Sequence, residues 1–193
     1  RHCAEGCYNC SIAGVEGETN CELCDYGNEY CNAKGFNLDA TLYGIHKGIV
    51  IDLNGYTLKL IGDLQASTLN ADAQMNVTGD LEASSVTMSG TGSVGGNLTV
   101  TGSLVFNEGQ LEVGGNCTVN GSNVIMTMTH DSDYLKVNGD FAFGPNISSY
   151  QYNNGNSALS AGTVEVKGDF TVEGYKYNGY GWGYNESGRH KTI

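Results

Sequence analysis

The sequence predicts an all-β fold: a parallel β-solenoid (β-helix) with irregular coils, preceded by a small disulfide-rich module. Three observations support this prediction. Glycine is abundant, at 29 of 193 residues, and it punctuates alternating Val, Thr and Leu, as in short strands joined by tight turns. One nine-residue phrase recurs along most of the chain, and six of the seven cysteines lie in the first 31 residues. We therefore expect a cysteine-rich cap or adaptor module over residues 1–35 and a solenoid shaft over 36–193.

The N-terminal segment holds an even number of cysteines in a short stretch rich in Gly and Asn, which favours three disulfides. Its two CxxC pairs, CYNC and CELC, also have the spacing of a zinc site, but two further cysteines flank them. The sequence leaves the pairing open. The predicted disulfide cysteines are Cys3, Cys7, Cys10, Cys21, Cys24 and Cys31.

The stretch GCYNCSIAGVEGETNCELCDYGNEYC, at residues 6–31, resembles the short units of furin-like and growth-factor-receptor-like extracellular modules. A cross-linked module placed before the first coil would cover a strand edge that otherwise recruits other chains. We therefore expect the N-terminal segment to act as a cap, or as an adaptor to a neighbour.

The repeated phrase reads apolar-x-apolar-x-Gly-Asp/Asn-apolar-x-apolar. Its copies are LKLIGDLQA (58–66), MNVTGDLEA (75–83), GSVGGNLTV (92–100), LEVGGNCTV (111–119), LKVNGDFAF (135–143) and VEVKGDFTV (164–172). The pivot glycines are Gly62, Gly79, Gly96, Gly115, Gly139 and Gly168, and they lie 17, 17, 19, 24 and 29 residues apart. Fixed phrases at this period are typical of stacked repeats, so each copy predicts one corner of one coil.

Within a copy, alternation places the apolar residues on one face of a strand. The alternation breaks only at the Gly-Asp/Asn step, where we expect glycine to adopt backbone angles that other residues avoid. In the fourth copy Cys117 takes the place that Leu or Phe has in the others, so we predict a buried cysteine.

The first coil is predicted to begin in GIVIDLNGYTLKLIGDL, at residues 48–64. Because Asn54-Gly55 marks a turn between two alternating runs, a β-hairpin is the competing interpretation. Later coils lengthen through polar insertions around 128–134, 144–158 and 174–188, which predict loops.

An acidic or amide residue follows every pivot glycine, so stacking would place these residues in a column. We favour corner residues that satisfy backbone donors. A ladder of calcium ions is the alternative, because hard cations prefer carboxylate oxygens, and no other cofactor or metal is predicted. The column comprises Asp63, Asp80, Asn97, Asn116, Asp140 and Asp169.

Charge and composition limit the partners. The net charge is −12, and no basic residue lies between Leu60 and Leu135. Such a surface repels phosphate backbones, so we expect no nucleic-acid partner. No apolar run reaches the length of about 18 residues that a membrane span needs, so no membrane insertion is expected. Seven Asn-x-Ser/Thr sequons are compatible with a secreted glycoprotein: Asn9, Asn76, Asn97, Asn116, Asn120, Asn146 and Asn185.

The segment YKYNGYGWGY is the candidate binding region, with Tyr175, Tyr177, Tyr180, Trp182 and Tyr184 separated by small residues. Exposed aromatic rings stack on sugars and form protein interfaces. The alternative is that these rings pack back over the open end of the last coil.

No catalytic motif is present, so we expect that the chain is not an enzyme. His130, Asp131 and Asp133 form the densest polar cluster, which we interpret as a solvated loop. A polysaccharide-degrading enzyme, with converging acids, is the least favoured hypothesis.

Residues 45–193 resemble the β-solenoid repeat regions of large secreted or surface proteins of gut Firmicutes-type bacteria. IDLNGYTLKLIGDL, LKVNGDF and AGTVEVKGDFTVEG carry the resemblance. It implies an extracellular structural or adhesive role without catalysis. We therefore expect a secreted or cell-surface scaffold or filament subunit that associates through its coil ends. An adhesin or carbohydrate-binding module that uses residues 175–184 is the alternative.

Overall fold

The computed structural model describes residues 21–22, 39–43, 46–121, 124–145, 158–172, 175–177, 180–182, 184 and 188–193. Every regular element in these ranges is a β-strand, and nearly all strand pairs are parallel. The prediction of an all-β chain with parallel sheets is therefore confirmed. None of the described residues forms a helix with the length and apolarity that a membrane crossing needs.

Two parallel sheets contain all but two of the described strands. The larger sheet contains β1 (Cys21–Glu22), β3 (His46–Asp52), β5 (Leu64–Ala71), β7 (Leu81–Met88), β9 (Leu98–Phe106), β11 (Cys117–Gly121), β12 (Ile125–Met128), β14 (Phe141–Pro145), β15 (Ala158–Leu159) and β17 (Phe170–Val172). The smaller sheet contains β2 (Ala40–Tyr43), β4 (Leu58–Ile61), β6 (Met75–Val77), β8 (Thr91–Val94), β10 (Gln110–Val113), β13 (Tyr134–Val137), β16 (Thr163–Val166) and β20 (Lys191–Thr192).

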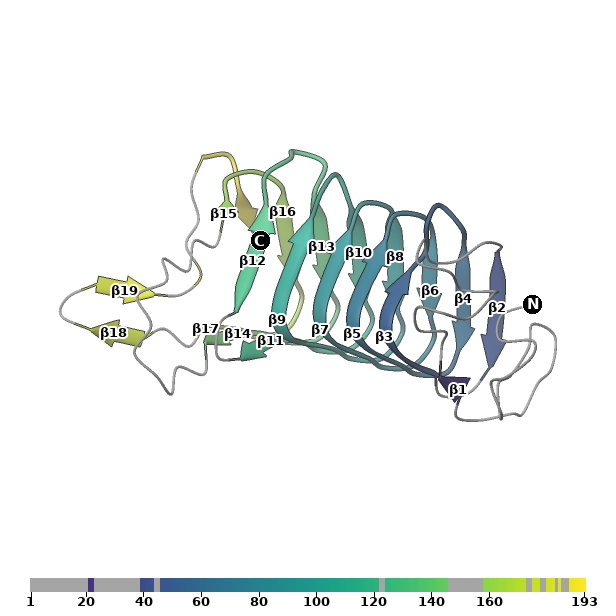
Figure 1. Ribbon diagram of the computed structural model, residues 1–193. Helices are drawn as coiled ribbons and strands as arrows, with labels where there is room; N and C mark the ends of the chain where they lie inside the picture. Colours follow the sequence, from purple (N-terminus) through teal and green to yellow (C-terminus); the bar gives the residue numbers. More distant parts are fainter. Residues whose placement is uncertain are drawn as a thin grey trace.

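The chain alternates between the two sheets, so one strand of each forms a layer, and successive layers stack side by side (Figure 1). The stacking register follows the repeated phrase. Leu64 pairs with Leu81, which pairs with Leu98, and the same column continues through Cys117, Phe141 and Phe170. All six copies of the phrase therefore lie in equivalent positions.

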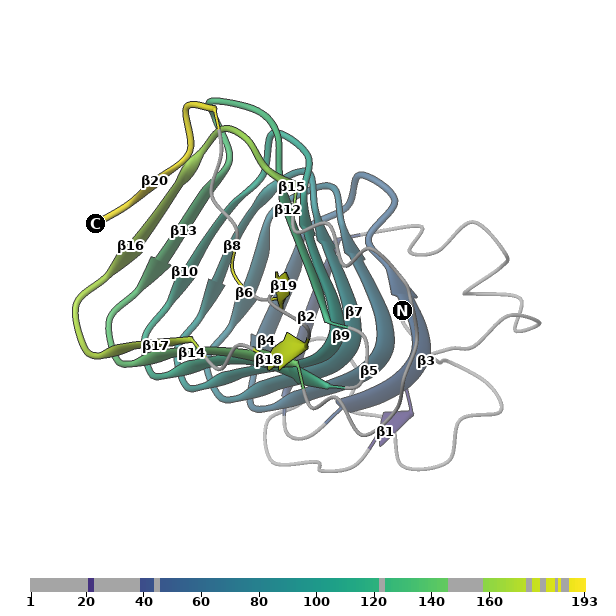
Figure 2. The ribbon, with the colours of Figure 1, turned by 90° about the vertical axis from the view of Figure 1, so that its left-hand side faces the viewer.

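The larger sheet bends along its own strands, so the outline in Figure 2 has three sides. The long strand β9 pairs with two shorter strands of the next layer, β11 through its first half and β12 through its second half. The pairing register of β7 and β9 shifts between Ala83 and Ser85, as at a β-bulge.

The segment at residues 48–64 is not a hairpin. β3 and β4 belong to different sheets, and each pairs in parallel with a strand of a neighbouring layer. Asn54 and Gly55, with φ values of 49° and 81°, do form a turn, and the Tyr56 N–H donates to the Leu53 carbonyl. This turn moves the chain from the larger sheet to the smaller one.

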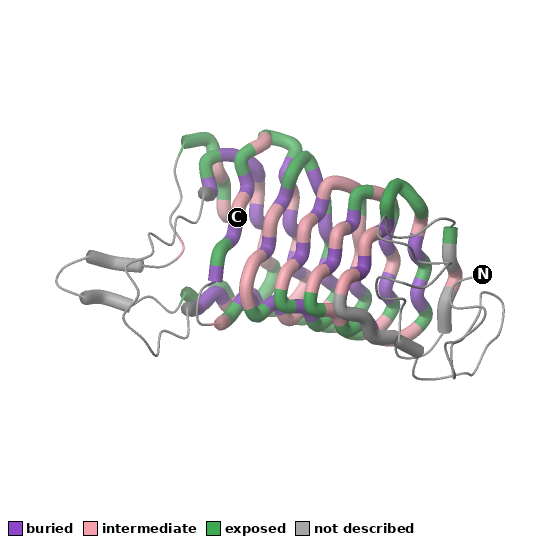
Figure 3. The backbone as a smooth tube through the Cα atoms, in the orientation of Figure 1, coloured by how far each residue is buried: buried purple, intermediate pink, exposed green. Residues whose placement is uncertain are grey.

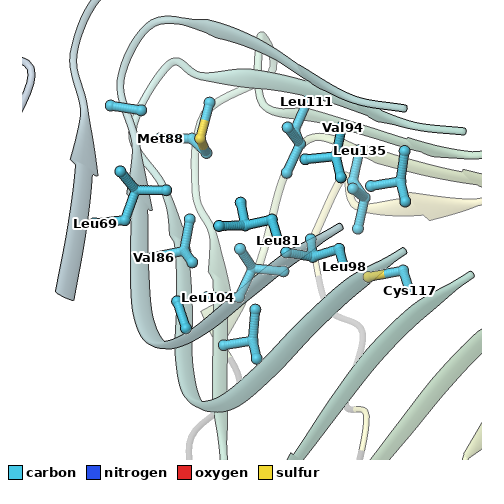
Figure 4. Close-up of a cluster of buried hydrophobic side chains, with 14 of the residues drawn as sticks. Leu69, Leu81, Val86, Met88, Val94, Leu98, Leu104, Leu111, Cys117 and Leu135 are labelled. Carbon is cyan, nitrogen blue, oxygen red and sulfur yellow. The ribbon is translucent and has the colours of Figure 1, made fainter. Parts of the chain in front are cut away.

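The core runs through the interior of the stack. Buried positions alternate with less buried ones along most of the strands (Figure 3), and the buried residues are almost all Leu, Val, Met, Ile or Phe. In Figure 4 the side chains of Leu81 and Leu98 from the larger sheet lie near those of Val94 and Leu111 from the smaller sheet. Full burial of one such side chain contributes roughly 2 kcal/mol, so the stack is stabilised layer by layer.

The two ends of the larger sheet differ. At the N-terminal end, β1 pairs in parallel with β3, with Cys21 opposite His46, so part of the cysteine-rich segment lies on the first layer. At the other end, β17 is the last strand along the sheet. The register also pairs the stretch ATLYGIHKG, at 40–48, with the first copy of the phrase, since β2 pairs with β4 and β3 with β5, although Ile45 and His46 differ from the phrase.

Candidate functional site

The Gly-Asp/Asn corners form a continuous hydrogen-bonded column along one edge of the stack. Each pivot glycine after Gly62 donates its N–H to the carbonyl oxygen of the pivot glycine in the preceding layer, whereas the Gly62 N–H donates to Thr78 Oγ1. The N···O distances are 2.8 Å for Gly79 to Gly62, 2.9 Å for Gly96 to Gly79, 2.8 Å for Gly115 to Gly96, and 3.0 Å for Gly139 to Gly115 and Gly168 to Gly139. The corners therefore continue the ladder between strands rather than interrupting it.

A second ladder runs beside the first and uses the Asp and Asn side chains. In each case Oδ1 of one layer accepts the N–H of the Asp or Asn in the next layer, as for Asp63 and Asp80 at 2.8 Å. Asp80 accepts from Asn97 at 2.6 Å, and Asn97 from Asn116 at 2.9 Å. Asn116 and Asp140 accept in the same way from Asp140 and Asp169, both at 2.9 Å. These side chains satisfy backbone donors, which is the corner role favoured above.

The reason for glycine at the corner differs from the one predicted. Of the six pivot glycines only Gly62 has a positive φ, so unusual backbone angles do not explain the other five. A Cβ added at any of those five would lie within 2.6 Å of the Oδ1 atom of the preceding layer's Asp or Asn. It would also lie within 3.0 Å of the preceding glycine's carbonyl group. Glycine is needed because the two ladders leave no room for a side chain.

The prediction that His130, Asp131 and Asp133 form a solvated loop is wrong for Asp133. Its side chain is buried, with the residue only 1% exposed, whereas Asp131 beside it is exposed. Oδ1 accepts the Glu108 N–H at 2.7 Å, and Oδ2 accepts the N–H groups of Thr129 and His130 at 2.8 and 2.9 Å. The carboxylate thus fastens a turn of one layer to the preceding layer. His130 Nδ1 lies 3.8 Å from Oδ2.

Other carboxylates, at the turns between the two sheets, also accept backbone N–H groups. Asp72 Oδ1 accepts from Gly55 at 2.8 Å, and Asp39 Oδ1 accepts from Thr57 at 2.7 Å. The described acids with such contacts are therefore placed to hold turns together. Within the described ranges, no group of three or more His, Cys, Asp or Glu side chains is arranged to hold a metal ion.

A charged row crosses the outer face of the smaller sheet. Lys136 Nζ donates to Glu112 Oε1 at 2.7 Å, and Asn138 Nδ2 donates to the same oxygen at 3.0 Å. These hydrogen bonds lower the pKa of Glu112, and the bond to Glu112 raises the pKa of Lys136. In the same part of the face the Tyr134 hydroxyl donates to Glu165, a bond that raises the pKa of Tyr134 to about 12.

Cys117 is fully buried, as its place in the repeat predicted. Burial raises the pKa of its thiol to about 12 because the interior disfavours the thiolate. Among the other cysteines, only Cys21 lies in the described residues, and there only as part of the backbone of β1. The predicted disulfides of Cys3, Cys7, Cys10, Cys21, Cys24 and Cys31 fall outside the described side chains and stay a prediction.

The aromatic segment divides into two parts. β18 (Tyr175–Tyr177) and β19 (Tyr180–Trp182) form an antiparallel hairpin beyond the last layer (Figure 1). Tyr184 instead packs back on the stack: its ring makes edge contacts with the rings of Phe141, Phe143 and Phe170, at centroid distances of 6.1, 5.7 and 5.2 Å.

Hydrogen bonds fix the Tyr184 ring in place, since its hydroxyl lies 3.0 Å from both His190 Nε2 and Thr192 Oγ1. For Tyr184 this agrees with the alternative stated above, that the aromatic rings pack back over the end of the last coil. Sequence spacing grouped Tyr184 with the other four aromatic residues, and its contacts with rings distant in the sequence, such as that of Phe141, could not be predicted from that spacing.

Comparison with known proteins gives no match: no family model, no curated protein and no solved structure is significantly similar to this chain.

Proposed function

We propose that this chain is an extracellular structural protein, in which a parallel β-solenoid serves as a scaffold or filament subunit. The observation that carries the proposal is the continuity of the stack. Strand pairing, the glycine ladder and the Asp/Asn ladder run in register through the six copies of the repeated phrase. Most of the polar side chains whose contacts are described form hydrogen bonds that hold turns or neighbouring layers together.

The cysteine-rich segment is proposed to cap this scaffold and to stabilise it through disulfides. The pairing of β1 with β3 supports the proposal, because β1 covers the edge that the first layer of the larger sheet would otherwise present. Disulfides persist in oxidising compartments, so this proposal and the extracellular location belong together.

The opposite end supports self-association. Phe170 and Val172 of β17 are both 39% exposed, whereas Phe141 and Phe143, which precede them in the same columns, are 0% and 2% exposed. The outer edge of β17 has no strand partner among the described residues. An apolar strand edge of this kind favours pairing with a further strand, and a second copy of the chain could supply one.

Sedimentation velocity over a range of concentrations tests the proposal, with electron microscopy of the same samples to detect filaments. We expect the sedimentation coefficient to rise with concentration. Val172→Lys should suppress this rise, because a charge on an edge strand opposes pairing. Thr99→Lys, on an outward position of a middle layer, is the matched control and should behave like the wild-type chain.

A sedimentation coefficient that stays constant at all concentrations would exclude self-assembly. The scaffold part of the proposal would fail if hydrogen exchange showed no protection through the middle layers.

A second candidate function is an adhesin or carbohydrate-binding module that uses residues 175–184. The observation that favours it is the position of the hairpin, because β18 and β19 project beyond the last layer, where a partner has access (Figure 1).

A further inference from the structure

The pairing register of the hairpin sorts its residues between two faces. Tyr175 is opposite Trp182, Lys176 is opposite Gly181, and Tyr177 is opposite Tyr180. Directly paired residues share a face of a two-stranded ladder, and alternate residues of one strand share a face. The register therefore puts Tyr175, Tyr177, Tyr180 and Trp182 on one face, and Lys176 with Gly181 on the other.

We propose that this four-aromatic face is a binding site for neutral polysaccharide chains. The inference rests on the second candidate function above and names its ligand class and its residues. Neighbouring positions on one face of a ladder lie about 5 Å apart across the strands and about 7 Å apart along them. Four aromatic residues at these spacings offer an area suited to stacking against consecutive sugar rings, whose C–H faces pack on aromatic rings.

Tyr184 is the anchor of the hairpin and is not part of the aromatic face. Its ring contacts Phe143 and Phe170 of the last two layers. Its hydroxyl forms hydrogen bonds with His190 and Thr192, which follow the hairpin in the sequence. The segment that carries the hairpin is thereby fixed to the stack at its C-terminal side. Figure 2, viewed from this end, shows β18 and β19 within the outline of the layers.

The composition of the hairpin favours a sugar over a protein partner. Residues 174–184 contain no Leu, Ile, Val or Met, and only Gly, Asn and a single Lys separate the aromatic residues. The cores of protein interfaces combine aromatic with other apolar residues. Aromatic rings among small polar residues instead match a ligand that offers flat C–H faces edged with hydroxyls.

The charge of the molecule favours a neutral sugar over an acidic one. The net charge is −12, and no basic residue lies between Leu60 and Leu135. The acidic surplus lies before residue 136, whereas residues 136–193 hold five basic and five acidic residues, so the part of the chain that carries the hairpin has no net positive charge to attract a polyanion. The single cation of the hairpin, Lys176, lies on the face opposite the aromatic residues. An acidic glycan would therefore find no net positive charge in this part of the chain and no cation on the aromatic face.

The test is depletion of the full chain from solution by microcrystalline cellulose, chitin and insoluble xylan, with polygalacturonate immobilised on beads as the acidic probe. We expect binding to at least one neutral polymer and none to polygalacturonate. Trp182→Ala should weaken binding at least tenfold, which corresponds to about 1.4 kcal/mol. Tyr177→Ala should also weaken it.

Two matched controls should bind like the wild-type chain: Lys176→Ala, on the opposite face of the hairpin, and Tyr56→Ala, which removes an exposed tyrosine of the shaft. Sedimentation and circular dichroism of each variant separate loss of the site from loss of the fold.

Three results would overturn the inference: no depletion by any neutral polymer, binding that Trp182→Ala leaves unchanged, or salt-sensitive binding to polygalacturonate that requires Lys176. Binding of the hairpin to protein alone, and to no polysaccharide, would also overturn the inference. Each of these results leaves the scaffold proposal standing, because that proposal is tested by sedimentation and hydrogen exchange.

Discussion

At the scale of single residues, the corner glycines are the positions with the least tolerance for change. We predict that Gly96→Ala destabilises the chain by about 3 kcal/mol, because the added methyl group must displace both Asp80 Oδ1 and the Gly79 carbonyl, whose carbon would lie 2.9 Å away. Urea unfolding monitored by circular dichroism measures this loss.

A double-mutant cycle identifies the cause of this loss. Combined with Asp80→Ala, the Gly96→Ala change should cost less, since the atom closest to the new methyl group is gone. Equal costs in both backgrounds would contradict the explanation by close approach and would favour a requirement for backbone angles.

The buried carboxylate of Asp133 gives a second prediction. Asp133→Asn should destabilise the chain by about 3 kcal/mol, because the amide replaces one acceptor oxygen of a buried side chain with a donor that faces the N–H group of Glu108, Thr129 or His130. Thermal unfolding measures the change. Asp131→Asn is the matched control: its partner Arg189 and its own side chain are both exposed, so its effect should stay below about 0.5 kcal/mol.

At the scale of elements, Tyr184 determines how the last layer is covered. Tyr184→Ala should expose Phe143, increase the exposure of Phe170 and lower the free energy of unfolding by about 2 kcal/mol, whereas Tyr184→Phe keeps the ring contacts and loses only the hydroxyl partners His190 and Thr192. Hydrogen exchange should show faster exchange in β17 and β20 for the alanine variant. Unchanged exchange in both strands would contradict this covering role.

The end of the stack also brings the two functional proposals into competition. β17 presents an apolar edge for a second copy, and β18 with β19 lies beyond the same end (Figures 1 and 2). Any end-to-end contact must include the hairpin or displace it. Polysaccharide bound to the hairpin should therefore inhibit self-association, and the two activities should be mutually exclusive in one molecule.

The elements that the sequence predicted are those that depend on a local pattern. Alternation identified the buried face of the strands, and the repeated Gly-Asp/Asn step identified the register, because both recur within nine residues. The burial of Asp133 and the anchoring of Tyr184 were not predictable in this way. They arise from contacts between layers, with Glu108 lying 25 residues from Asp133 and Phe141 far from Tyr184 in sequence.

At the scale of the whole molecule, charge opposes the stacking that the backbone favours. The Asp/Asn ladder repeats a carboxylate at Asp63, Asp80, Asp140 and Asp169 along one edge, in a chain with a net charge of −12. Asn97 and Asn116 divide these carboxylates into two pairs, which limits repulsion between neighbouring layers. The ladder is thus a compromise between satisfied backbone donors and repelling charges.

Because repulsion destabilises a compact acidic chain, we predict that the unfolding temperature rises as NaCl increases from about 10 mM to 500 mM, over which the Debye length falls from about 30 Å to less than 10 Å. Asp80→Asn should reduce this salt dependence, since it removes one carboxylate and keeps the oxygen that accepts the Asn97 N–H.

Measurements with CaCl2 and MgCl2 at matched ionic strength test the calcium ladder at the same time. If screening alone acts, both salts should raise the unfolding temperature equally. A rise that is specific to calcium, saturable, and lost in Asp80→Asn would instead mean that the column binds the ion. An unfolding temperature that stays constant in all three salts would contradict both the screening argument and the calcium ladder.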